Sequence, residues 1–269
     1  MLHRVRDIWP CIAGIVLAVT LDVKSARCEF DGPRHAVDYC RPYTGTIKLS
    51  DDGTILCFDG AITADRNTAA FHELKQNGFF VVRSPGGYAA IGIVLSEILL
   101  DKNATVIIYD YCLSGCANYF LIASSKTYVM RNTIVAWHGG PQRTYCAEGD
   151  IERLRKQYAV SPDARQWPSP ELECKQTELS DAFFKRRGMK EQHLHQPQTA
   201  DTKKIVDFAM RLAWEKRSIF WMWHPKNHRD YFKSRVVYES YPDSQDEVDE
   251  IVIRLRLGLR VFYDWPITF

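Results

Sequence analysis

The spacing of apolar and polar positions predicts an α/β layer between residues 45 and 138. Short apolar runs rich in β-branched and aromatic residues are typical of strands, whereas apolar positions three and four residues apart are typical of helices. After an initial pair of strands the two kinds of segment alternate, which indicates a mostly parallel sheet covered by helices. The expected strands are 46–50, 54–62, 79–84, 104–111, 126–130 and 133–138, and the expected helices are 64–78, 88–103 and 114–124.

The second half of the chain has a different pattern, which predicts helices joined by proline-containing loops. These helices are expected over residues 150–158, 170–187 and 201–223. A last helix begins at Ser244, because Ser244 and Glu247 have the spacing of a capping box and apolar residues follow on one helical face. The chain is therefore divided into an N-terminal segment 1–26, an α/β core 27–145 and a mainly helical appendage 146–269.

The N-terminus has the composition of an export signal. Arg4 and Arg6 precede an uncharged stretch from Ile8 to Leu21. These 14 residues are too few for a transmembrane helix, which needs about 20, but they match the apolar region of a signal peptide. Cleavage after Ser25 or Ala26 predicts a periplasmic or extracellular protein, whereas an uncleaved segment predicts membrane association through an N-terminal anchor.

Export changes the interpretation of the eight cysteines. Disulfides form readily outside the cytosol. Seven cysteines follow the N-terminal segment, so at least one stays free or pairs between chains. Cys28 with Cys40, and Cys146 with Cys174, are candidate loop-closing pairs, although spacing alone does not fix the connectivity.

Composition and motifs exclude several function classes. Apolar residues make up 46% of the chain, charged residues 25%, and the formal net charge is +2. A charge this small gives no reason to expect nucleic acid as a partner. The sequence also has no dinucleotide-binding fingerprint, Walker loop or HExxH motif, so we expect neither ATP nor another cofactor, and no metal.

Three features at the ends of expected strands are candidates for chemistry. Gly86 and Gly87 make a turn whose backbone can approach a ligand closely. Ser114 opens a helix, where unpaired N–H groups favour developing negative charge. His138 ends a strand just before another sharp turn. Each feature also has a purely structural explanation, namely a strand-to-helix turn, a helix N-cap and a surface histidine.

Cys112 and Cys116 lie two residues to either side of Ser114. Two thiols four residues apart within a helix are too distant to bridge easily, so a disulfide becomes feasible if Cys112 lies outside the helix. As zinc ligands the pair is poor, because with His138 it gives only three donors. A cysteine nucleophile is a further alternative, since a helix N-terminus lowers the pKa of a thiol.

Together, the order of the Ser84-Pro85-Gly86-Gly87 turn, Ser114 and His138 resembles the Clp-protease and crotonase-like superfamily. The likeness is greatest to its exported branch, small periplasmic proteins similar to the Clp proteolytic subunit. The resemblance covers Thr46 to Pro141, less than half of the chain. It implies a spiral core of repeated ββα units, a peptide or protein substrate, and assembly into a homo-oligomer.

The resemblance also implies a role for each residue. Ser114 falls on the nucleophile, His138 on the general base, and the N–H groups of Gly86 and Gly115 on the two donors to the oxyanion. The aspartate that follows the histidine in the family has no clear counterpart. Asp181, 43 residues after His138, is the nearest in spacing and is the expected third residue.

Three functions follow as hypotheses. The first is an exported serine hydrolase, an ATP-independent endopeptidase with a Ser114–His138 dyad or triad. The second is a catalytically inactive binding or scaffold protein of the cell envelope, which the missing acid and the unmatched helical half favour. The third is a metal-binding protein. A separation of more than about 5 Å between Ser114 Oγ and the His138 ring nitrogens would favour the second.

Overall fold

The centre of the molecule is a sheet of seven strands in the order β1-β2-β3-β4-β5-β8, with β6 also paired to β4. The computed structural model describes residues 21–63, 68–138, 148–159, 170–189, 219–222 and 235–263. All pairs in this sheet are parallel except β1 with β2, which confirms the expected α/β class. The strands are β1 (Ile47–Leu49), β2 (Ile55–Asp59), β3 (Phe79–Ser84), β4 (Thr105–Leu113), β5 (Thr127–Val129), β6 (Ile134–Ala136) and β8 (Val236–Tyr238).

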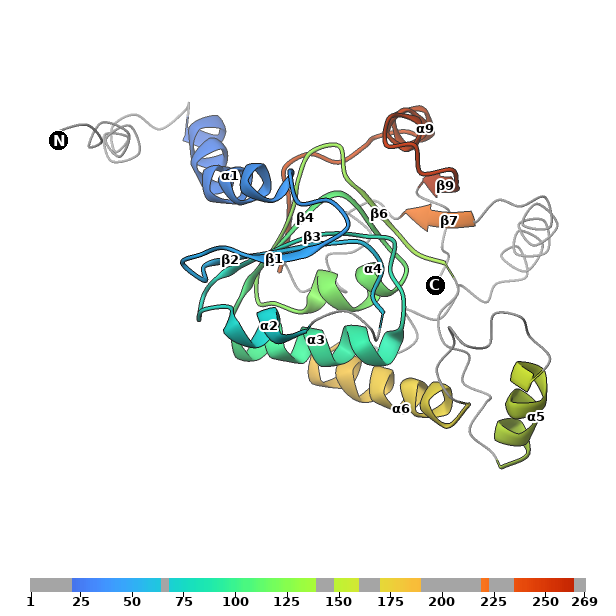
Figure 1. Ribbon diagram of the computed structural model, residues 1–269. Helices are drawn as coiled ribbons and strands as arrows, with labels where there is room; N and C mark the ends of the chain where they lie inside the picture. The colour runs from blue at the N-terminus through green and yellow to red at the C-terminus, as the bar shows by residue number, and fades with distance from the viewer. Residues whose placement is uncertain are drawn as a thin grey trace.

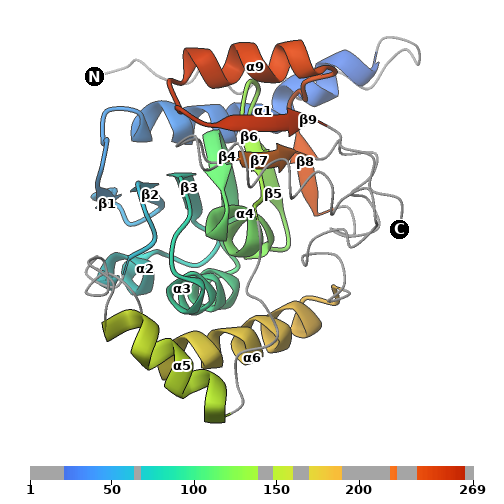
Figure 2. The same ribbon diagram turned by 90° about the vertical axis from the view of Figure 1, so that its right-hand side faces the viewer.

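Helices cover both faces of the sheet (Figures 1 and 2). One face carries α2 (Ala69–Glu73), α3 (Ala89–Asp101), α4 (Gly115–Tyr119) and α6 (Pro170–Arg186). The other carries α1 (Leu21–Cys40) and α9 (Gln245–Arg254). The remaining helical elements are the 3-10 turn η2 (Phe120–Ile122), which continues α4, and α5 (Glu148–Ala159), which lies beside α6.

The alternation of side chains along each strand explains why both faces are covered. In β3, Phe80 and Val82 point into the core beneath α2 and α3, whereas Val81 points toward α1. All three are fully buried. Since each side chain of this kind stabilises the fold by roughly 1.5–3 kcal/mol when removed from water, a strand with two apolar faces requires helices on both sides.

The described part of the C-terminal half is mainly helical, as predicted, but it also contains strands that the sequence did not predict. Its strand β8 pairs with β5 in the central sheet, and β7 (Ile219–Met222) pairs with β9 (Arg260–Tyr263) in a second, two-stranded sheet. The helix predicted over 201–223 is therefore wrong at 219–222, and the rest of that range lies outside the described residues. A four-residue apolar run rich in aromatic residues fits a strand as well as a helix, and its partner β9 is remote in sequence.

The other helix predictions for this half are confirmed. Both α5 and α6 lie where apolar spacing placed them, within two residues at each end. At the start of α9, the Ser244 hydroxyl accepts a hydrogen bond from the N–H of Glu247 at 3.3 Å. The Glu247 carboxylate accepts from the N–H of Asp243 rather than from that of Ser244, so the capping box is shifted by one residue on this side.

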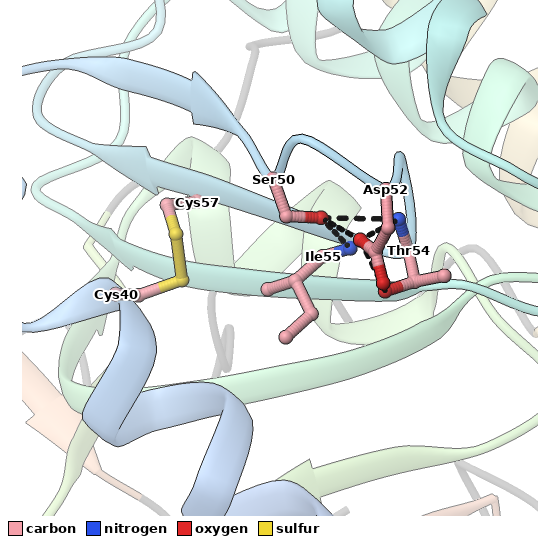
Figure 3. Close-up of a disulfide and its surroundings, with 6 residues drawn as sticks. All are labelled: Cys40, Ser50, Asp52, Thr54, Ile55 and Cys57. Carbon is pink, nitrogen blue, oxygen red and sulfur yellow. Dashed lines mark hydrogen bonds between the residues drawn. A yellow bond between two sulfur atoms is a disulfide. The ribbon is translucent and has the colours of Figure 1, made fainter. Parts of the chain in front are cut away.

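A disulfide joins Cys40, the last residue of α1, to Cys57 in β2 (Figure 3). The predicted pair Cys28–Cys40 is therefore wrong. Since β2 holds Cys57 on the sheet face that α1 covers, the bond fixes the end of this helix against the sheet. The predicted pair Cys146–Cys174 falls on side chains outside the described part of the structure.

The turn between β1 and β2 is held by its own polar side chains (Figure 3). The Ser50 hydroxyl donates to Asp52 Oδ1 at 2.6 Å, and the backbone N–H of Thr54 donates to the same oxygen at 3.0 Å. These hydrogen bonds stabilise the charged carboxylate and lower the pKa of Asp52 to about 2. The expected turn at 51–53 is confirmed.

No helix within the described residues is both long and apolar enough to cross a membrane. Residues 1–20, which include most of the predicted export signal, are not among them. The cleaved signal and the retained anchor therefore both stay predictions.

The Cys40–Cys57 bond predicts a measurable stability difference. The double variant Cys40→Ser/Cys57→Ser should lose about 3 kcal/mol of unfolding free energy, because the bond closes a loop of 17 residues in the unfolded chain. Urea unfolding of the double variant and of the oxidised wild-type protein, carried out side by side, measures this loss. A variant as stable as the oxidised wild-type protein would contradict the account.

Candidate active site

Ser114 lies at the sharp turn between β4 and α4, with φ 52° and ψ −121°. A residue with a side chain rarely adopts this left-handed backbone conformation, which costs about 1–3 kcal/mol. The Ser114 side chain makes no capping hydrogen bond to α4. Ser114 therefore occupies the N-cap position, but its hydroxyl does not act as the cap.

A second disulfide, between Cys112 and Cys116, spans this turn. Cys112 belongs to β4 and Cys116 to α4, with their Cα atoms 5.2 Å apart. Both side chains are fully buried. Because Cys112 lies outside the helix, the condition for a disulfide is met, and the predicted disulfide is present. Neither sulfur is therefore a free thiol for metal binding or nucleophilic attack.

The Ser114 hydroxyl is hydrogen-bonded to His138, with 2.7 Å between Oγ and Nε2. The register of β4 with β6 brings the two residues together. Leu113 pairs with Ala136, and the backbone N–H of Ser114 donates to the Ala136 carbonyl at 3.0 Å. His138 follows only two residues later, so strand pairing places its ring beside the serine.

The short strand β7 supports the histidine from the other side. Trp137 and Trp221 exchange two backbone hydrogen bonds, of 2.9 and 2.8 Å. The His138 ring meets the Phe220 ring edge to face, with centroids 4.7 Å apart. The sequence analysis did not predict this contact, because it placed Phe220 and Trp221 in a helix. The aromatic and β-branched residues of this short run are typical of a strand and could have indicated one.

The surroundings of His138 favour the neutral form of its ring. The residue is exposed at the surface, yet the protein on the other sides of the ring removes enough water to lower its pKa from the ordinary 6.5. Desolvation disfavours the imidazolium form, so the ring is neutral at neutral pH. A neutral imidazole is the form that can accept a proton from a serine hydroxyl.

In the described part of the chain no hydrogen bond joins Asp181 to His138, so its predicted role as the third residue stays without support. It lies on α6, where its charge adds to the effect of burial in raising the pKa of Tyr119 to about 12. Its neighbour Ser180 is hydrogen-bonded to the Tyr119 hydroxyl at 2.9 Å. Among the described residues no carboxylate bonds to the His138 ring.

The glycine turn packs directly against the serine. A Cβ on Gly86 would lie 2.7 Å from the Ser114 Cβ and 2.7 Å from the Gly115 nitrogen. The N–H of Gly86, the predicted oxyanion donor, already donates to Ser84 Oγ at 3.1 Å. Within the described chain, the N–H groups of Gly87 and Gly115 have no such partner, so Gly87 replaces Gly86 as the candidate donor.

No cluster of three or more histidine, cysteine, aspartate or glutamate side chains suited to a metal lies in the described ranges. No model of a known protein family matches this chain, and no curated protein matches it in sequence. The fold and site define a mixed α/β protein with a hydrogen-bonded serine–histidine pair at the carboxyl ends of the parallel strands of its central sheet.

Packing of the glycine turn predicts a strong effect of Gly87→Ala. Its Cβ would lie 2.2 Å from the Ile62 carbonyl oxygen, at φ 144°. We expect this variant to lose about 1–3 kcal/mol more unfolding free energy than Gly258→Ala in urea denaturation. Gly258 is a matched control, with φ 65° and no atom within 4 Å of a new Cβ. Equal losses would show that the turn is not tightly packed.

Proposed function

We propose that this chain is an exported serine hydrolase, an ATP-independent endopeptidase of the Clp type, and that its α/β layers belong to a Clp- and crotonase-like spiral. One observation carries the proposal: the hydroxyl of a serine in strained backbone conformation is hydrogen-bonded at 2.7 Å to a neutral histidine. Strain of this kind persists where the surrounding fold enforces it, and it concentrates at catalytic turns.

The mechanism assigns one step to each group. His138 Nε2 accepts the Ser114 proton as Oγ attacks the carbonyl carbon of a peptide, forming a tetrahedral intermediate. The N–H groups of Gly87 and Gly115 donate to the oxyanion. The imidazolium then gives its proton to the departing amine, and water hydrolyses the acyl-enzyme with His138 again as base.

In the described part of the chain, His138 is held in a different way from the histidine of a complete triad. In a triad a carboxylate holds the imidazole in the required tautomer, and replacing it lowers kcat about 10⁴-fold in the best-known case. Among the described residues, the Phe220 ring and the Trp137–Trp221 backbone bridge hold the ring instead. Neither contact brings a negative charge to the imidazolium, so these contacts alone predict slow turnover.

The inactive scaffold is the less favoured alternative. A distance of more than about 5 Å between Ser114 Oγ and the His138 ring nitrogens would favour a scaffold, whereas the distance from Oγ to Nε2 is 2.7 Å. Export is supported by two disulfides, which persist in oxidising compartments. Peptide substrate, homo-oligomer and N-terminal membrane association remain parts of the proposal that rest on sequence.

Covalent labelling by a fluorophosphonate tests the nucleophile. The wild-type protein should become labelled, Ser114→Ala should not, and His138→Asn should react at least about 10²-fold more slowly because it has lost its base. Ser125→Ala, which changes an exposed serine, serves as the control and should react like the wild type. Equal labelling of Ser114→Ala would reject the assignment.

The lowered pKa of His138 predicts the pH dependence of labelling. The rate should be constant near neutral pH and should fall as acid protonates the imidazole, with an inflection below 6.5. Desolvation opposes the charged form, so the inflection moves toward acid and not toward base. Rates of the wild-type protein between pH 4.5 and 8 give this value; an inflection above 6.5 would contradict the assigned environment.

A further inference from the structure

The Arg83 side chain connects three neighbouring strands of the central sheet. It projects from β3, donates to both oxygens of Asp59 at the end of β2, at 3.1 and 2.6 Å, and donates to Asp110 Oδ2 in β4 at 2.9 Å. The three side chains are at most one-fifth exposed. The guanidinium also lies over the Tyr109 ring, 5.3 Å from its centre.

Asp110 marks an irregularity in β4. Between the pairs Val82–Ile108 and Ser84–Cys112, β3 advances by two residues while β4 advances by four. Asp110 has φ 57°, a left-handed conformation that aspartate tolerates better than most residues but at some cost. The bulge is therefore a strained element that its surroundings must hold in place.

The bulge is also the point at which β4 changes its partner. Residues before it pair with β5, as in Ile108–Val129, and residues after it pair with β6, as in Leu113–Ala136. The second pairing gives Ser114 its hydrogen bond to the Ala136 carbonyl and brings His138 to the serine hydroxyl. A change at the bulge would therefore shift Ser114 relative to His138.

Arg83 is tied to the glycine turn as well. Its carbonyl accepts from the N–H of Gly60 at 3.0 Å, and three residues later the Gly86 carbonyl accepts from the N–H of Ile62 at 2.8 Å. Asp59, its bidentate partner, also accepts from the N–H of Gly45 at 2.8 Å. One guanidinium thus links the strand that leads into the turn with the strand that leads into the serine.

Stability alone is a weak reason for such a cluster. Desolvation of buried charges largely cancels their attraction, and apolar replacements of similar volume are often neutral for stability. The best-attested use of buried ion pairs is to select one register among alternatives. A two-residue register change between β3 and β4 is a place where such selection is needed.

We propose that Arg83 and Asp110 are positioning residues for the Ser114–His138 pair: their ion pair holds the β4 bulge in the register that gives the serine its hydrogen bond to the histidine. The expected effect of the two residues on catalysis rests on the proposed hydrolase function. Neither residue touches the reacting atoms, so their effect passes through the backbone of β4.

Three variants and one control test the proposal. Asp110→Asn removes the charge but keeps a side chain that tolerates positive φ, and Arg83→Met removes the guanidinium at similar length. The double variant joins the two changes. Arg34→Met is the control, because it breaks a partly buried ion pair with Glu239, of 2.6 Å, that does not involve β4.

The first readout is the rate of fluorophosphonate labelling as a function of pH. Each single variant should react at least tenfold more slowly and should lose the acid inflection of His138, whereas Arg34→Met should keep both. The losses of the two single variants should not multiply in the double variant, because both changes break the Arg83–Asp110 ion pair, although Arg83 also pairs with Asp59 and Asp110 also lies near Arg41. Wild-type rates and inflections in both single variants, or losses that multiply in the double variant, would overturn the proposal.

The second readout is hydrogen exchange at the Ser114 amide, which needs no activity. In Arg83→Met and Asp110→Asn this amide should exchange faster than in Arg34→Met, because its bond to Ala136 is loosened. If the wild-type protein is not labelled but the amide responds, the hydrolase function fails and the positioning role stands. If the amide exchanges at the wild-type rate in both variants, the positioning role fails, whatever the labelling shows.

Discussion

The parallel pairing of β4 with β6 is the constraint on which the site depends. It gives the Ser114 amide its bond to Ala136 and leaves only one residue between that carbonyl and His138. A backbone ladder fixes positions far more tightly than a contact between two flexible side chains, so the 2.7 Å hydrogen bond between serine and histidine follows from strand register. The other features around the site act by holding this register or the turn that follows it.

Three kinds of constraint act together at the turn. The Cys112–Cys116 bond ties the end of β4 to the start of α4, so that Ser114 has little room to relax from its positive φ. The glycine turn fills the space on one side, where a side chain at Gly86 would collide with Ser114. The β7 strand supports His138 on the other side, through backbone bonds and the Phe220 ring. Covalent, steric and hydrogen-bonding constraints thus keep the pair in place without a carboxylate on the histidine among the described residues.

The sequence could predict what is local. Apolar periodicity predicted the order of strands and helices from β1 through β6 but not the helix α1 before them, and residue types at strand ends indicated Ser114 and His138. Contacts between remote segments could not be read in this way: the β7–β9 pairing and the Cys40–Cys57 bond both depend on how distant segments pack. The choice between Gly86 and Gly87 was equally inaccessible, because it depends on the direction of each N–H in the folded turn.

A crystal structure of the protein after reaction with a fluorophosphonate is the most direct test of the whole account. We expect phosphorus bonded to Ser114 Oγ, and a phosphoryl oxygen within hydrogen-bonding distance of the N–H groups of both Gly87 and Gly115. We also expect His138 still beside the serine, with the β4–β6 register unchanged. An adduct on another residue, or a phosphoryl oxygen directed away from both glycines, would contradict it.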